Sequence, residues 1–135
     1  MSTYIWPDNQ AILDDFADYF DEIGQELQIV SKEDLQAGFD RVRNAFGYKP
    51  DADAAELAAL IFESVSSRHA LVDGNKPLAW QAMTVFLDMN GVWFDAPEKA
   101  SFDIAMAVVE HTKTVEDLAE FIREHTSTES PETPP

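Results

Sequence analysis

The sequence predicts an all-α, compact single-domain fold of about six helices. Apolar residues recur at spacings of three and four along most of the chain, which is the pattern of helices with one buried face. The 135 residues fit one domain, and 45% hydrophobic with 11% aromatic residues can supply a core. Only residues 92–94 have the composition of a strand, and they are too few to found a sheet. We therefore expect one helical domain over residues 1–125, followed by a disordered, proline-containing tail over residues 126–135.

Start and stop signals define the first two helices. A Pro-Asp pair at residues 7–8 opens the first, and Gly24 closes it. Ser31 with Asp34 three positions later resembles a capping box and opens the second, which residues 47–50 end. The predicted buried stripes are Ile12, Phe16, Phe20 and Ile23 in the first helix, and Leu35, Phe39, Val42 and Phe46 in the second.

The next four helices follow from the same reasoning. The third, over about residues 53–69, is the most apolar and is expected near the centre. The fourth follows a break at residues 73–75 and stops at Asn-Gly. The fifth spans about residues 97–111, and Thr114 with Asp117 caps the sixth. The predicted apolar positions of the third to sixth helices are, in turn, Leu57, Leu60, Ile61 and Val65; Ala79, Met83, Phe86 and Leu87; Phe102, Ala105, Met106 and Val109; and Val115, Leu118, Phe121 and Ile122.

The charge balance disfavours several classes of partner. The chain has 9 Lys and Arg against 26 Asp and Glu, a formal net charge of −17 that is spread over both halves. Such a surface repels phosphate backbones and anionic lipids, so we expect no nucleic acid and no membrane as partner. Cysteine is absent, and the N-terminus does not resemble a signal peptide. We expect a soluble, cytoplasmic protein.

Residues 69–91 carry the pattern that indicates chemistry. A helix ending in His69 is followed by a polar turn and by a new helix that starts at Gly-Asn-Lys. The free backbone N–H groups of such a helix start bind anions, and Lys76 adds a positive charge there. The carboxylate of Asp73 could share a Mg²⁺ ion with a phosphate, and His69 could accept a proton from a hydroxyl. Together these groups describe phosphate-group transfer to an alcohol.

Taken singly, these residues also have structural interpretations. A histidine at a helix C-terminus commonly interacts with the helix dipole, Asp-Gly-Asn is an ordinary turn, and Lys76 alone is a solvated lysine. His111 and His125 are the only other histidines, so a transition-metal site is disfavoured. The chain also lacks a Walker-type P-loop.

The combined spacing is more specific than its parts. It reads His-x3-Asp-Gly-Asn-Lys-x2-Ala-x6-Phe-Leu-x2-Asn-Gly and closely resembles the signature of the Fic/Doc family, in particular its death-on-curing branch. Leu71 stands where that branch has phenylalanine. The resemblance extends over most of the chain and implies a compact helical enzyme that uses ATP and Mg²⁺ to modify a protein hydroxyl.

The family's roles transfer residue by residue as expectations. His69 resembles the general base, and Asp73 resembles the metal-binding carboxylate. Gly74 and Asn75 resemble the anion-binding turn, and Lys76 resembles the phosphate-binding lysine. A lysine at this position is typical of the members that transfer the terminal phosphate of ATP, whose known target class is translation elongation factor Tu.

Pro77 departs from the family, which has an arginine there that reaches the nucleotide phosphates. Proline has neither a charge nor an N–H, so we expect activity to be impaired while the fold survives, because proline fits the first turn of a helix.

The resemblance implies a toxin of a toxin–antitoxin system, with a prevent-host-death-like antitoxin as partner. Two alternatives stay open. One is AMP transfer, as in Fic enzymes; the other is a catalytically inactive module that binds an antitoxin or another protein. For that module Trp6, Trp80 and Trp93 are candidate anchors, with core packing as their alternative role.

Overall fold

The computed structural model describes residues 4–24, 31–48, 51–67 and 75–127, which form helices and one pair of very short strands. In chain order the elements are α1 (Asn9–Glu22), α2 (Lys32–Tyr48), α3 (Ala54–Ser66), α4 (Asn75–Met89), β1 (Trp93–Phe94), α5 (Glu98–Val109), α6 (Val115–Glu124) and β2 (Thr126–Ser127). The prediction of an all-α fold is therefore confirmed. Within the described residues, no helix is both long and apolar enough to cross a membrane.

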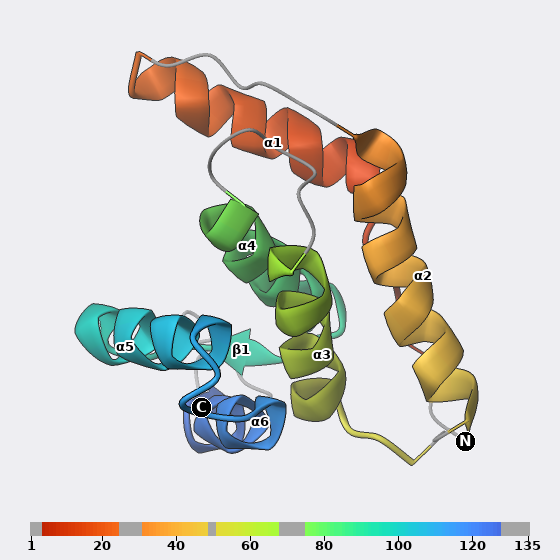
Figure 1. Cartoon of the computed structure of the whole chain (residues 1–135), viewed down its shortest axis with the longest axis vertical. Coiled ribbons are helices and arrows are strands. Elements are labelled where there is room, and N and C mark those ends of the chain that lie inside the picture. The colour runs from red at the N-terminus through yellow and green to blue at the C-terminus, as the bar shows by residue number, and fades with distance from the viewer. Residues whose placement is uncertain (1–3, 25–30, 49–50, 68–74, 128–135) are drawn as a thin grey trace.

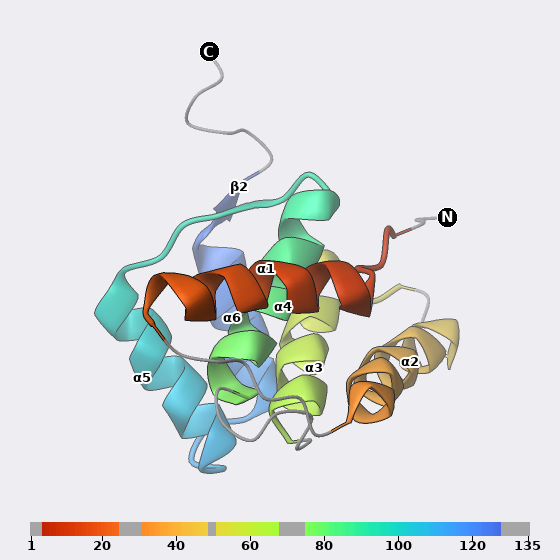
Figure 2. The same ribbon diagram turned by 90° about the horizontal axis from the view of Figure 1, so that it is seen from above.

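Helix α3 lies at the centre, as its apolar sequence predicted. It contacts α2, α4 and α6, and α1 crosses the bundle to contact α2 and α4 (Figures 1 and 2). Four alanines in α3 allow these neighbours to approach closely, and most of its side chains are buried. The largest fully buried side chains come from several helices: Phe39, Phe62, Phe86, Ile12, Leu35, Leu57, Ile61, Leu78, Met83, Leu87 and Leu118. One continuous core thus joins the helices that precede and follow residues 68–74.

The predicted caps of several helices are present. The hydroxyl oxygen of Ser31 accepts a hydrogen bond from the backbone N–H of Asp34 at 3.1 Å. Thr114 and Asp117 form a complete capping box at the start of α6. Gly24 and Gly91 follow α1 and α4 with φ near +75°, a conformation that glycine adopts without a steric penalty. Local sequence signals therefore define these boundaries.

Two predicted features of the N-terminal half were wrong. Ile23 is exposed because it lies in the turn after α1 has ended at Glu22, so it no longer follows the buried stripe. Helix α3 ends at Ser66 rather than near residue 69. The backbone N–H of Ser67 donates to the carbonyl of Glu63, and its hydroxyl donates to the carbonyl of Ser64, which satisfies the last-turn carbonyls early.

Helix α5 is much less buried than its sequence pattern predicted. Val108 is its only buried residue, whereas Phe102 is 65% exposed and Ala105, Met106 and Val109 are half-buried. The helix contacts α3 and α6, but these contacts do not cover its full apolar stripe. Apolar side chains of α5 therefore remain accessible beside α4.

Residues 92–94 have the composition of a strand, but their pairing with residues 126–127 was not anticipated. β1 and β2 pair antiparallel, with Trp93 opposite Ser127 and Phe94 opposite Thr126, and the N–H of Asp95 donates to the carbonyl of His125 at 2.9 Å. Backbone pairing of this kind needs no apolar side chains, so composition could not reveal it. Thr126 and Ser127, which the prediction assigns to the tail, thus form β2, and residues 128–135 lie outside the described structure.

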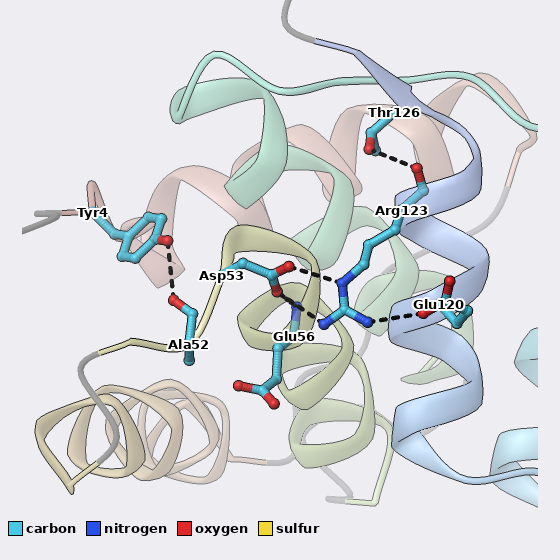
Figure 3. A network of polar contacts seen from close by, with 7 residues as sticks. All are labelled: Tyr4, Ala52, Asp53, Glu56, Glu120, Arg123 and Thr126. Atoms are coloured by element: carbon cyan, nitrogen blue, oxygen red, sulfur yellow. Dashed lines mark hydrogen bonds and ion pairs between the residues drawn. The ribbon is translucent and has the colours of Figure 1, made fainter.

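A polar network joins α6 to the start of α3 (Figure 3). The guanidinium of Arg123 donates from Nε to Oδ2 of Asp53 at 2.8 Å and from Nη2 to Oδ1 at 3.1 Å. It also donates to Glu120 at 3.1 Å. Oδ1 of Asp53 accepts the backbone N–H of Glu56 at 2.9 Å, which caps α3. One aspartate thereby both starts the central helix and holds it to α6.

Candidate functional site

The predicted site falls on both sides of the boundary of the described structure. His69, Asp73 and Gly74 lie outside the described residues. Asn75, Lys76 and Pro77 form the first turn of α4, where the sequence placed a helix start. Asn75 and Lys76 are therefore at a helix N-terminus, as expected, while anion binding at this turn and the roles of His69, Asp73 and Gly74 stay predictions.

The start of α4 is anchored by the residues that follow Pro77. Leu78 and Ala79 are fully buried, whereas Lys76 and Pro77 are exposed. Because α4 packs against α3, the core fixes the position of this first turn. The N–H groups of a first turn have no partner within their own helix, and proline removes one of these donors. What remains is a helix start with a single lysine beside it.

A cleft of about 950 Å³ opens directly next to this helix start. One wall is α4, whose lining residues recur with helical spacing from Lys76 to Thr84; the other is the segment from Phe94 through α5. The lining residues are Lys76, Pro77, Trp80, Gln81, Thr84, Phe94, Asp95, Ala96, Glu98, Ser101, Phe102, Ala105 and Met106. A smaller cavity of about 280 Å³ shares Thr84 and Phe94 with it. The cleft has the size of a small-molecule or peptide-anchoring site.

Aromatic side chains give the cleft a rigid apolar wall. The ring of Trp80 lies edge-to-face against buried Phe62, with centroids 5.7 Å apart, and 5.9 Å from the ring of Phe94. Phe94 in turn lies 6.3 Å from Phe121 of α6. Trp80 is half-buried, so it both packs on the core and lines the cleft. Core packing and accessibility to a partner are therefore compatible for this tryptophan.

The other two tryptophans differ from Trp80. Trp6 packs 5.1 Å from Phe86 and carries the guanidinium of Arg43 at 5.7 Å from its ring centroid, so it belongs to the edge of the core. Trp93 is 36% exposed on β1 and borders the smaller cavity.

The cleft carries charges of both signs. Lys76 lies at one end, and Asp95 and Glu98 are exposed on the opposite wall. Among the described residues, neither of these two carboxylates has an ion-pair partner. The described residues also contain no cluster of three histidine or carboxylate side chains that could hold a metal ion.

Sequence reasoning did not find most of the cleft. The sequence assigns no role to Gln81, and it predicts Phe102, Ala105 and Met106 as part of a buried helix face. One signal was available: residues 77, 81 and 84 share one face of α4, and that face begins in the same first turn as Lys76.

Comparison with known proteins supports part of the expected resemblance. No family model matches the chain. A curated protein, Toxin Doc of Mycolicibacterium smegmatis, is 46% identical over 52 residues. The match covers 38% of this chain and 37% of that protein, so the chain matches little more than a third of its relative's length. The chain is thus similar to a Doc toxin over a limited segment.

Proposed function

We propose that this protein is a Doc-like toxin of a toxin–antitoxin system that transfers the terminal phosphate of ATP to a protein hydroxyl. The observation that carries the proposal is the motif of residues 69–91, whose Asn-Lys turn begins helix α4 on a buried anchor. The partial similarity to Toxin Doc supports the toxin class. The proposed target is of the elongation factor Tu class, and a cognate antitoxin is the proposed partner.

In this proposal each residue has a separate role in the transfer of one phosphate. The first turn of α4 and Lys76 hold the phosphate oxygens of ATP. His69 takes the proton from the acceptor hydroxyl, whose oxygen attacks the γ-phosphorus as the bond to ADP breaks. A Mg²⁺ ion shared by Asp73 and the phosphates would neutralise negative charge when bound.

Pro77 is expected to limit the rate. An arginine at residue 77 would present a guanidinium at the exposed face of the first turn, beside the phosphate held by Lys76. By analogy with arginine fingers, such a contact contributes about 10³ to 10⁵ in rate. The present sequence should therefore transfer phosphate slowly or not at all.

The decisive experiment restores that contact. The unmodified chain, Pro77→Arg, and Pro77→Arg with His69→Ala are incubated with elongation factor Tu and ATP labelled at the α- or γ-phosphate. We expect label from the γ-phosphate to appear on the factor, at least about 10³-fold faster with Pro77→Arg than with the double variant. His111→Asn in the same background is the matched control, because it removes an imidazole from an exposed position.

The outcomes separate the proposals. Equal rates for Pro77→Arg and the His69→Ala double variant would refute the kinase assignment. Transfer of α-label instead of γ-label would indicate AMP transfer, as in Fic enzymes.

One observation favours a second candidate, a non-catalytic module that binds an antitoxin or another protein. Pro77 supplies neither charge nor N–H where a nucleotide phosphate would be held, yet the helix start is intact. This module should not bind Mg-ATP in calorimetry, even in the Pro77→Arg variant, while still binding the product of an adjacent antitoxin gene. Binding of Mg-ATP by the unmodified chain would contradict it.

A further inference from the structure

The cleft between α4 and α5 extends well beyond the helix start that the proposed reaction uses. Lys76 and Thr84 line the same wall, and the helical rise separates them by about 12 Å. A phosphate at Lys76 therefore occupies only one end. Thr84 and Phe94 line the smaller cavity together, so Phe94 marks the other end, and Asp95 and Glu98 follow it in the chain; this end has no assigned occupant.

The chemistry of that other end disfavours a second anion. Asp95 and Glu98 are exposed, and no cation among the described residues pairs with them. The chain as a whole carries a net charge of −17, which adds to the negative potential. A nucleotide that extended its phosphates in this direction would meet repulsion, whereas a lysine or arginine side chain would be attracted.

The surface between the two ends is apolar and accessible. Phe102 is 65% exposed at the cleft, with half-buried Met106 and Trp80 also lining it. An aromatic side chain left this exposed beside a cleft is a favourable contact for an apolar anchor residue. The order along the cleft is thus a positive end, an apolar middle and an acidic end.

We propose that this cleft docks the acceptor segment of the protein substrate, and that the segment presents an apolar side chain next to a lysine or arginine. The proposal rests on the proposed phosphoryl transfer, because it places the acceptor hydroxyl toward Lys76. The apolar residue packs on Phe102 and Trp80, and the basic residue pairs with Asp95 or Glu98. These contacts select the substrate and do not take part in the reaction itself.

The test measures binding and needs no catalytic activity. Short fluorescein-labelled peptides carry a central Leu-Phe pair flanked by lysines, by glutamines or by glutamates, and a fourth has the lysines with Gly-Ser in place of Leu-Phe. Fluorescence anisotropy at physiological salt gives their affinities for the full chain. We expect the lysine peptide with Leu-Phe to bind at least about tenfold more tightly than the other three.

Two variants with matched controls locate the binding. Phe102→Ala should weaken binding of the lysine peptide about fivefold, whereas Tyr48→Ala, which removes an aromatic ring that is 92% exposed, should not. Glu98→Lys should weaken it about fivefold, whereas Glu116→Lys should change it less than about twofold. Both glutamates are exposed and lie in the first turn of a helix, so the two reversals alter net charge and helix dipole alike.

Competition identifies the source of the segment. Unlabelled elongation factor Tu should displace the lysine peptide, and Mg-ATP should not. Displacement by Mg-ATP would assign the cleft to the nucleotide and overturn the proposal, as would peptide binding that elongation factor Tu leaves unchanged. Equal losses of peptide affinity in Glu98→Lys and Glu116→Lys would show a non-specific charge effect and would also overturn the proposal. Failure of phosphate transfer with selective peptide binding intact would refute the proposed reaction but not the docking site.

Discussion

The ion pair between Asp53 and Arg123 gives the sharpest stability prediction. Asp53 has two functions, because its side chain caps α3 and also binds the guanidinium of α6 (Figure 3). Asp53→Asn keeps a cap acceptor while removing the charge, and Asp53→Ala removes both. Arg123→Met keeps much of the apolar stem while removing the guanidinium. The three variants therefore separate capping from ion pairing.

The expected magnitudes follow from exposure and geometry. The side chains of Arg123 and Asp53 are 36% and 52% exposed, so solvent screens their attraction. Exposed pairs contribute about 0.2–1 kcal/mol, and the two-point contact favours the upper end of that range. Asp53→Asn should therefore lower the free energy of unfolding by about 1 kcal/mol. Asp53→Ala should lower it by about 2 kcal/mol, because the cap contributes about 1 kcal/mol more.

Urea unfolding of the single and double variants measures the coupling. We expect the Asp53→Asn and Arg123→Met effects to fall short of additivity by about 0.5–1 kcal/mol. Lys99→Met is the control, since the Lys99–Asp103 pair is more exposed and should contribute less than the Asp53–Arg123 pair. Strict additivity, or equal effects of Asp53→Asn and Asp53→Ala, would refute this account.

The same pair predicts a pH dependence. The hydrogen bond from the Arg123 guanidinium lowers the pKa of the Asp53 carboxyl below the ordinary aspartate value. A carboxyl with a lowered pKa in the folded state stabilises the fold at and above the ordinary aspartate range, and this stabilisation is lost as the pH falls through the lowered value. The stability difference between the unmodified chain and Asp53→Asn should thus shrink in acid and be constant near neutral pH.

Four further variants test the packing, turns and caps. Leu57→Ala should lower the free energy of unfolding by about 2–5 kcal/mol, because this fully buried side chain leaves a cavity; a loss below about 1 kcal/mol in urea unfolding would contradict the packing. Gly91→Ala should lower the free energy of unfolding by about 1 kcal/mol because φ is +74°. Gly47→Ala should raise it by about 0.5–1 kcal/mol, because Gly47 lies inside α2 with open space around it. Effects of the same sign would contradict this assignment of the two backbone conformations. Thr114→Ala should cost about 1 kcal/mol by removing one side of the capping box, and an unchanged thermal midpoint would exclude that role.

Most of the fold was predictable because its signals are local. Caps such as Ser31 and Thr114, and glycines such as Gly24 and Gly91, act within a single turn of chain. The prediction failed where distant residues decide. The burial of an α5 side chain depends on which helices lie beside it, and Phe102 has the right spacing for a core residue, but none of the described helices covers it. Pairing of Trp93 with Ser127 is likewise non-local.

The candidate site was predictable in part for the same reason. The helix start at Asn75 and Lys76 follows from a contiguous motif, and the structure has it there. The cleft lies between α4 and the segment from Phe94 to Met106. Its presence depends on how the helices pack, so no spacing in the sequence predicts it. Its apolar residues had the composition of core, so only their exposure in the structure distinguishes a docking surface from packing.

Pro77 separates the stability of α4 from the chemistry proposed for it. Proline is tolerated in a first turn, and the packing of this turn depends on Leu78 and Ala79, which are fully buried. Pro77→Arg replaces an exposed residue and should change the free energy of unfolding by no more than about 1 kcal/mol, mainly through the unfolded chain. A gain in phosphate transfer at an unchanged urea midpoint would therefore report the restored phosphate contact alone. A large loss of stability would instead show that residue 77 has a structural role that the exposed first turn does not predict.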